Sequence, residues 1–161
     1  MLWLLLGSAT AHADRSYTLL GGGAATGIAG EPGMVMRAEM YTFDTEGDSS
    51  GGMALGIGAA ARVWRVAGDT GLDVPLGIAF GAHSGPVHTT LGGGTGILAA
   101  ALRGRDSGIG VTPFANGRLG VALGGEWLAA VDVRATREVM YGLADRTTFD
   151  VVVLLGKHSH F

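Results

Sequence analysis

The sequence predicts an all-β fold: an antiparallel, up-and-down transmembrane β-barrel of about eight strands. Three observations lead to this prediction. Apolar residues alternate with small or polar ones along long segments, and glycine is abundant, at 30 of 161 residues. The mean hydropathy is high, at +0.34, yet no apolar run beyond the N-terminus reaches the roughly 18 residues of a spanning helix. Barrels combine these features because their apolar residues occupy every second position.

The clearest alternation lies between residues 53 and 82. Apolar residues hold the odd positions from Met53 to Val63 and the even positions from Leu72 to Phe80, on either side of a turn at residues 67–71. A period of two on both sides of a turn predicts a β-hairpin. Each arm has the length, about 9–11 residues, that a tilted strand needs to cross a bilayer.

Six further segments complete the predicted barrel. They are residues 17–28, 34–43, 91–102, 109–123, 127–140 and 147–161. Between them we expect turns at 31–33, 103–108 and 141–146, and solvated loops at 44–52 and 83–90. The longer connections are thus expected after the second and fourth strands. Pro113 and the pair Asn116-Gly117 are expected to interrupt the sixth strand, because proline is tolerated only at strand edges, ends or bulges.

Composition restricts the possible functions. The net charge is −3 and 16% of residues are charged, below the usual quarter or so. A nucleic-acid-binding protein would need a basic stripe on its surface, and a disordered chain would be far less apolar. Neither class is therefore expected. The absence of cysteine excludes disulfides, thiolate metal sites and cysteine nucleophiles.

Residues 1–13, MLWLLLGSATAHA, are typical of the end of a secretory signal peptide. Leu2–Leu6 forms an apolar core, and Ala11-His12-Ala13 or Ala9-Thr10-Ala11 fits the cleavage site. A basic region is missing, so we expect the natural start to lie upstream. The alternative is a short buried N-terminal helix. We expect residues 14–161 to form a single barrel domain.

Charged residues within the strands indicate which face of each strand points into the lumen and which faces lipid. Wherever the alternation is regular they share the face opposite the aliphatic row. They are Arg37, Glu39, Arg62, Asp73, Arg118, Asp132, Arg134, Glu138 and Asp150. An arginine facing lipid near mid-bilayer costs about 2–4 kcal/mol, whereas opposite charges inside a narrow barrel can pair. We therefore expect a lumen filled by ion pairs, with glycine and alanine leaving room for arginine, and a lower unfolding temperature for Arg134→Leu.

The alternative is a soluble barrel or sandwich with the two faces exchanged. Its outer face would carry many lysine, glutamate, serine and threonine residues. Here that face is mostly glycine and alanine, and Lys157 is the single lysine. The membrane interpretation is favoured, and a secreted soluble barrel that binds a small apolar ligand is kept as the alternative.

The chain resembles the small outer-membrane β-barrels of Gram-negative bacteria. The resemblance rests on the signal-like start, the alternating strands and the terminal Phe161. In that family a C-terminal phenylalanine preceded by alternating apolar residues is read by the barrel-assembly machinery. Val151, Val153 and Leu155 fit this pattern, and Lys157 and Ser159 depart from it. The family has long outer loops and short periplasmic turns, a division that the loops expected here do not follow.

The resemblance implies an outer-membrane location, with membrane lipid and the assembly machinery as partners. It also implies a structural, surface or porin-like narrow-pore role. Members carry aromatic girdles near the strand ends. The candidates here are Tyr17, Tyr41, Phe43, Trp64, Phe80, Trp127, Tyr141, Phe149 and Phe161.

One cluster, His158-Ser159-His160, has residue types that could form a catalytic or metal site. Some small outer-membrane barrels are lipid A hydrolases with a histidine and a serine two residues apart. Here His158 and Ser159 are consecutive, so on a strand they point to opposite faces and the serine is not activated. His158 and His160 share a face, and a metal bound together with His83 or His88 is the alternative to plain polar residues. Glycine-rich residues 92–96 lack the Lys-Ser/Thr of a phosphate loop, and acidic residues 44–48 lack the EF-hand spacing. We therefore expect no catalytic residue, metal or cofactor.

Overall fold

The computed structural model describes residues 15–48, 51–102, 107–141 and 145–160. These residues form nine strand segments and no helix. The segments are β1 (Arg15–Gly27), β2 (Pro32–Asp48), β3 (Gly51–Val66), β4 (Asp69–Ser84), β5 (Val87–Ala101), β6 (Gly108–Val111), β7 (Phe114–Gly124), β8 (Trp127–Met140) and β9 (Arg146–His160). No helix in the described part of the chain is long and apolar enough to cross a membrane.

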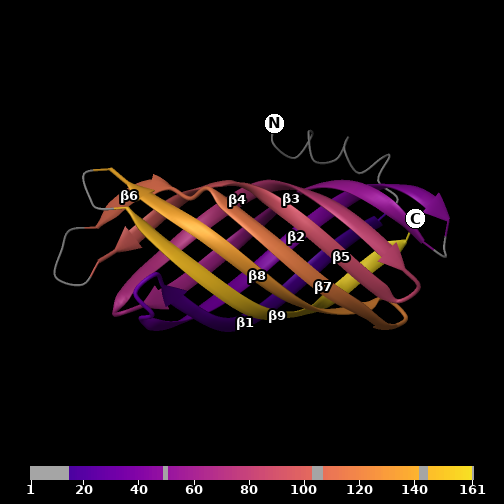
Figure 1. Ribbon diagram of the computed structural model, residues 1–161, viewed down its shortest axis with the longest axis horizontal. Coiled ribbons are helices and arrows are strands. Elements are labelled where there is room, and N and C mark those ends of the chain that lie inside the picture. The colour runs from indigo at the N-terminus through magenta and orange to yellow at the C-terminus, as the bar shows by residue number, and fades with distance from the viewer. Residues whose placement is uncertain (1–14, 49–50, 103–106, 142–144, 161) are drawn as a thin grey trace.

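The strands close into a barrel of eight positions (Figure 1). All pairings are antiparallel and, except at β6 and β7, join strands that are consecutive in the chain; β9 closes the ring by pairing with β1 from Arg15↔His160 to Gly27↔Thr148. Segments β6 and β7 share one position, between β5 and β8. The predicted up-and-down β-barrel is therefore confirmed. Both described ends of the chain lie at the same end of the barrel, which we call the terminal mouth.

Side chains alternate between the two faces as predicted. In β4 the aliphatic residues Leu72, Val74, Leu76 and Ile78 are all exposed on the outer wall, and the intervening Asp73 is 1% exposed. The same alternation holds in β2, β3, β8 and β9. The apolar face is outside, and the charged face is inside.

Two predicted loops are wrong. Strand β2 continues to Asp48 and β3 begins at Gly51, so most of the polar segment 44–52 is strand. Likewise β4 and β5 are joined by Gly85-Pro86 alone, and residues predicted as loop are strand pairs, among them His83↔His88. Polar composition alone does not indicate a loop, because strands that extend beyond an apolar band carry polar residues too. The expected long connections after the second and fourth strands are therefore absent.

The sixth predicted strand is interrupted at Pro113 as expected, but not at Asn116-Gly117. The break falls at Thr112-Pro113, where proline has no N–H to donate. Thr112 still exchanges backbone hydrogen bonds with Gly96, at 3.0 and 3.2 Å, so the ladder continues past the break. Asn116 and Gly117, in contrast, lie within the regular pairing of β7.

Four aromatic residues predicted as girdle candidates lie inside the barrel instead: Tyr17, Tyr41, Phe43 and Trp64 are at most 8% exposed. Three of them lie opposite a glycine of the neighbouring strand, in the pairs Tyr41↔Gly58, Phe43↔Gly56 and Trp64↔Gly71. A Cβ at any of these glycines would collide with the ring. At these three positions lumen glycine therefore makes room for aromatic rings. The expectation that lumen glycine leaves room for arginine stays a prediction. Phe80, Trp127, Tyr141 and Phe149 are exposed on the outside.

The predicted signal peptide, residues 1–13, and the assembly signal at Phe161 lie outside the described residues. Both stay predictions.

Candidate functional site: the polar lumen

The structure places inside the barrel all nine charged residues that the alternation put on the lumen face. Arg37, Glu39, Arg62, Asp73, Arg118, Asp132, Arg134 and Glu138 are each at most 6% exposed. Asp150, the ninth charged residue within a predicted strand, is fully buried. They divide into two clusters along the barrel axis, with Arg134 between them on β8.

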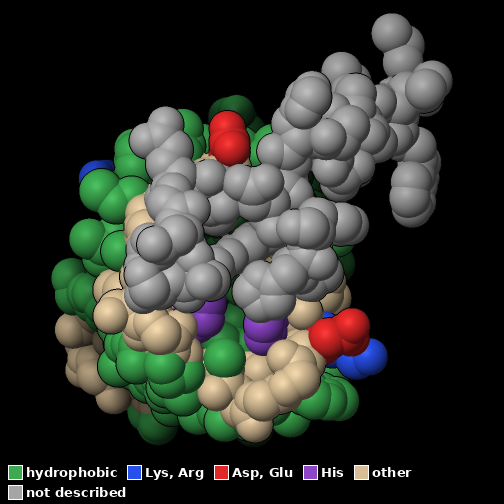
Figure 2. Space-filling model, turned by 90° about the vertical axis from the view of Figure 1, so that its right-hand side faces the viewer, with side chains coloured by type: hydrophobic (Ala, Val, Ile, Leu, Met, Phe, Trp, Pro, Cys, Tyr) green, Lys and Arg blue, Asp and Glu red, His purple; other side chains and the backbone are tan. Residues whose placement is uncertain are grey.

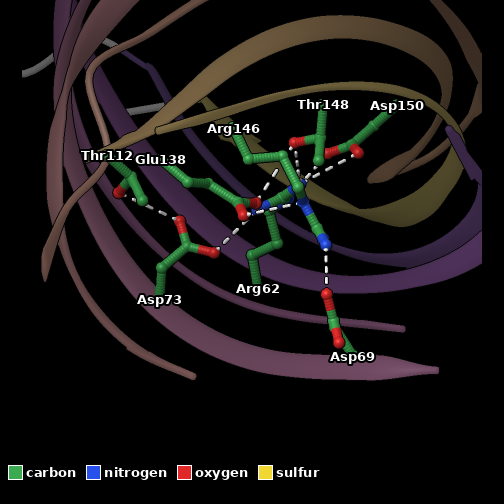
Figure 3. Close-up of polar contacts among 8 residues, drawn as sticks. All are labelled: Arg62, Asp69, Asp73, Thr112, Glu138, Arg146, Thr148 and Asp150. Carbon is green, nitrogen blue, oxygen red and sulfur yellow. Dashed lines mark hydrogen bonds and ion pairs between the residues drawn. The ribbon is translucent and has the colours of Figure 1, made fainter. Parts of the chain in front are cut away.

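Figure 3 shows the Arg62 cluster, formed by Arg62, Asp73, Glu138, Thr148 and Asp150. It lies toward the end opposite the terminal mouth, since Thr148 pairs with Gly27 at the far end of β1. Arg62 Nε donates to Asp150 Oδ2 at 2.6 Å, and its Nη2 donates to Asp150 Oδ1 at 3.0 Å. Its Nη1 donates to Asp73 Oδ1 at 3.0 Å and lies 3.7 Å from Glu138 Oε1. One guanidinium thus joins three carboxylates from β4, β8 and β9. Two-nitrogen pairing of this kind is the strongest form of an arginine–carboxylate contact.

Hydroxyl groups and a rim arginine complete this cluster. Thr148 Oγ1 accepts a hydrogen bond from Arg62 Nη2 at 3.0 Å and donates to Glu138 Oε1 at 3.3 Å. Thr112 donates to Asp73 Oδ2 at 3.4 Å. Nearer the rim, Arg146 lies 3.2 Å from Glu138 Oε2 and donates to Asp69 Oδ2 at 2.8 Å. The second cation offsets part of the excess of carboxylate around Arg62.

The central cluster, formed by Arg37, Glu39, Asn116, Arg118 and Asp132, lies nearer the terminal mouth. Asp132 Oδ1 is 2.6 Å from Arg37 Nη1, and its Oδ2 accepts hydrogen bonds from Asn116 Nδ2 at 2.7 Å and from Arg118 Nη2 at 3.2 Å. Glu39 forms an ion pair with Arg118 and lies 3.8 Å from Arg37. Carboxylates from β2 and β8 thus bridge arginines from β2 and β7 across the lumen.

Arg134 behaves differently from the other buried arginines. It is 1% exposed, yet none of its three guanidinium nitrogens hydrogen-bonds to a described residue, and it forms no ion pair with one. Its guanidinium carbon lies 4.2 Å from the centroid of the Phe114 ring. The structure therefore buries Arg134 as predicted but does not bring it into a pairing network.

Sequence reasoning missed the uncharged and rim partners: Asn116, Thr112, Thr148, Arg146 and Asp69. Alternation carried a signal for one of them, since Thr148 lies two residues before Asp150 on the same face of β9. It carried none for Asn116, because Asn116-Gly117 has the composition of a turn.

Aromatic and imidazole side chains gather at the terminal mouth. The Tyr17 hydroxyl is 3.2 Å from His88 Nδ1, and the ring of His88 lies 6.1 Å from that of His83 and 6.2 Å from that of His158. As these rings stand, no three of the described His, Asp and Glu side chains are arranged to hold a metal ion. The side chain of Ser159 lies outside the described residues, so its expected separation from His158 stays a prediction.

No protein-family model and no curated protein matches the chain. Solved structures do match it. Neisserial surface protein A superposes with a TM-score of 0.65 at 9% identity, covering 91% of this chain and 96% of that one. The outer-membrane enzyme PagL gives 0.56 at 15% identity, covering 87% and 97%. Ail, the attachment invasion locus protein of Yersinia pestis, solved with the heparin analogue sucrose octasulfate, gives 0.51 at 11% identity, covering 90% and 98%.

These likenesses define the class of the fold. The chain has the fold of the small, eight-stranded outer-membrane β-barrels of Gram-negative bacteria. Sequence identity to each of these three structures is at most 15%, so the similarity extends to the fold alone.

Proposed function

We propose that this protein is an integral outer-membrane barrel with a structural or surface role and a closed, non-conducting lumen. The observation that carries the proposal is the distribution of side chains between the two faces of the barrel wall, with apolar side chains outside and charged side chains inside. Large aliphatic and aromatic side chains, including Leu76 at 61%, Phe80 at 61% and Val153 at 61%, are exposed on the outside. Four arginines and five carboxylates are buried within. A lipid bilayer, not water, is the solvent that this arrangement suits.

The same observation opposes the soluble alternative. A secreted barrel that binds a small apolar ligand needs an apolar interior and a polar exterior. Here the middle of the lumen is occupied by the two charge clusters. The large buried side chains Trp64, Arg37 and Arg62 also fill the narrow interior of an eight-stranded barrel, which favours a plug over a porin-like pore.

Membrane lipid around the outer wall and the barrel-assembly machinery reading Phe161 remain the partners we propose. A non-enzymatic role is also part of the proposal. PagL is described as an enzyme, but likeness in fold at 15% identity does not transfer its activity. The names of Neisserial surface protein A and Ail point to surface proteins, which is the support for a surface role.

Tryptophan fluorescence tests the wall polarity directly. Trp127 is 48% exposed on the outer wall at the start of β8, and Trp64 is 1% exposed in the lumen. In vesicles of lipid brominated near the headgroup, and in a Trp3→Phe background, we expect Trp64→Phe to leave a strongly quenched protein. We expect Trp127→Phe to leave one that is barely quenched. The reverse result would place the aliphatic face in the protein interior and support the soluble alternative.

A further inference from the structure

A proline interrupts the backbone ladder between β3 and β4. Pairing runs as far as Ala59↔Leu76 and resumes at Arg62↔Asp73, and the two residues between them on each strand, Pro75 among them, are skipped. Proline has no N–H to donate to a neighbouring strand, which is why it is rare in the interior of a sheet. The line of pairing between β3 and β4 is therefore weaker here than in a regular ladder.

A second proline interrupts the ladder on the β8 side of β6 and β7. Segment β6 pairs with β8 at Gly110 and Val111 alone, and pairing resumes only in β7. Between these segments lies Pro113, whose carbonyl accepts a hydrogen bond from the Arg137 N–H at 2.9 Å. Because proline returns no N–H, β6 is held to β8 by few backbone bonds.

The two gaps lie in one row across the wall. Pro75 is opposite Gly96 on β5, and Gly96 exchanges backbone hydrogen bonds with Thr112, the residue before Pro113. In an antiparallel ladder a residue that bonds to one neighbouring strand does not bond to the other, so Pro75 turns its nitrogen toward β3, where the first gap lies. Strands β4 and β5 pair without a gap. Strands β4, β5 and β6 thus form a continuous piece of wall, which we call the panel, with a proline gap on each side.

Side chains of the Arg62 cluster bridge both gaps from the lumen (Figure 3). Across the first gap, Arg62 on β3 donates to Asp73 on β4 at 3.0 Å. Thr112 and Glu138 lie on either side of the second gap and are joined through the same two residues. The Thr112 hydroxyl donates to Asp73 Oδ2 at 3.4 Å, and Arg62 Nη1 lies 3.7 Å from Glu138 Oε1.

We propose that the Arg62 cluster is a latch that holds the panel closed against β3 and β8, and that β6 moves away from β8 when the latch is released. Segment β6 is the part that moves because it has four residues and pairs with β8 at two of them. Its movement opens the wall at the end opposite the terminal mouth (Figure 1). The terminal mouth, which faces the viewer in Figure 2 with its histidine side chains, takes no part in this opening.

The latch explains why a charge network lies at this level of the barrel. A buried ion pair is by itself weak evidence for stability, but here side-chain bonds join strands whose backbone bonds are interrupted. Proteins open locally where few backbone bonds hold a segment in place. The inference adds a moving part to the barrel, goes beyond the proposed function and does not depend on a membrane location.

Hydrogen exchange of the folded full chain in detergent, followed for single amides by NMR, tests the proposal. Val111 and Val139 pair across the β6–β8 line, and Val151 and Val153 belong to the β1–β9 ladder, which has no gap. We expect the first two amides to exchange at least about tenfold faster than the last two, because a local opening breaks fewer bonds than unfolding of the barrel.

Removal of the gap proline should slow this exchange. Pro113→Ala restores an N–H that can donate to the carbonyl of Arg137, and we expect exchange at Val111 to slow about fivefold, the effect of one hydrogen bond. Pro86→Ala is the matched control, because Pro86 lies in the connection between β4 and β5, outside both gaps, and it should leave exchange at Val111 unchanged. Unchanged exchange in Pro113→Ala would show that the proline does not weaken the wall.

Release of the latch should have the opposite effect. Thr112→Val removes the hydroxyl that donates to Asp73, and should speed exchange of the two β6–β8 amides about fivefold. Asp73→Asn, which removes the ion pair with Arg62, should speed it more. Thr136→Val is the matched control, because Thr136 is 1% exposed in the lumen and its hydroxyl hydrogen-bonds to no described residue. It should behave as wild type. Heat-modifiability on a cold gel shows that each variant is folded.

Two further outcomes would overturn the proposal. In the first, the β6–β8 amides of the wild type exchange as slowly as those of the β1–β9 ladder, so the wall has no weak line at β6. In the second, folded Thr112→Val and Asp73→Asn leave β6–β8 exchange unchanged or speed exchange equally in both ladders. The Arg62 cluster would then stabilise the barrel as a whole and would not be a latch.

Discussion

Arg62 and Arg134 are equally buried, but their environments differ. Arg62 is fully buried with three carboxylates around it, and Arg134 is 1% exposed with no ion-pair partner among the described residues. The cost of burying a charge is offset only when the charge is paired. The two positions therefore separate the effect of a lost ion pair from that of a lost buried charge.

We predict opposite results for Arg62→Met and Arg134→Met. Removing Arg62 leaves Asp73, Glu138 and Asp150 facing one another, and should lower the free energy of unfolding by about 3–5 kcal/mol. Removing Arg134 takes away an unpaired charge, and should leave stability unchanged or raise it. Urea unfolding in lipid vesicles measures both. This revises the loss of stability that the sequence alone predicted for Arg134→Leu. A loss in Arg134→Met as large as that in Arg62→Met would show that Arg134 is paired after all.

At the scale of the strand, pairs of an aromatic residue and a glycine shape the lumen. Tyr41 lies directly opposite Gly58, and a Cβ at Gly58 would meet the base of the ring, which cannot turn away. At Gly81 the nearest ring atom, in Phe43, is 3.5 Å from such a Cβ, an ordinary contact distance.

Gly58→Ala should therefore destabilise the barrel, by about 1–3 kcal/mol, and Gly81→Ala should be tolerated. Thermal unfolding in detergent compares the two. Equal effects would mean that the ring over Gly58 moves aside freely.

The turn between β3 and β4 offers a stabilising change. Ala67 has φ 55° and Gly68 has φ 93°, and a two-residue turn with positive φ at both positions prefers Asn-Gly. We expect Ala67→Asn to raise the free energy of unfolding by about 0.5–1 kcal/mol, because alanine is strained in this conformation. Gly68→Ala should lower it. A destabilised Ala67→Asn would contradict the assigned turn.

The sequence was informative where alternation was regular and not where composition was the guide. The two-residue alternation of apolar and polar side chains correctly predicted that Arg62, Asp132 and Arg134 face the lumen, because one buried face fixes the register of every strand. The same pattern could not tell which charges meet, since pairing across the lumen depends on the stagger of the strands. Polar residues 44–48 were mistaken for loop because strands longer than the apolar band also carry polar residues.

At the scale of the whole molecule, two charge clusters and several buried aromatic rings occupy the lumen. We predict no single-channel conductance for the protein in planar bilayers, because a narrow eight-stranded interior packed with side chains leaves no water path. The matched variant is Arg62→Ala combined with Asp150→Ala, which empties the middle of the Arg62 cluster. Conductance by the wild type would contradict a closed lumen and would indicate a narrow pore instead.

Fractionation of the native host, followed by a gel run cold and after boiling, tests the proposed membrane barrel most directly. A closed barrel with an apolar exterior should be recovered in detergent-extracted outer membranes, and its band should shift in mobility on boiling. Recovery in the soluble fraction with no shift would contradict the membrane barrel and make the aliphatic face a core.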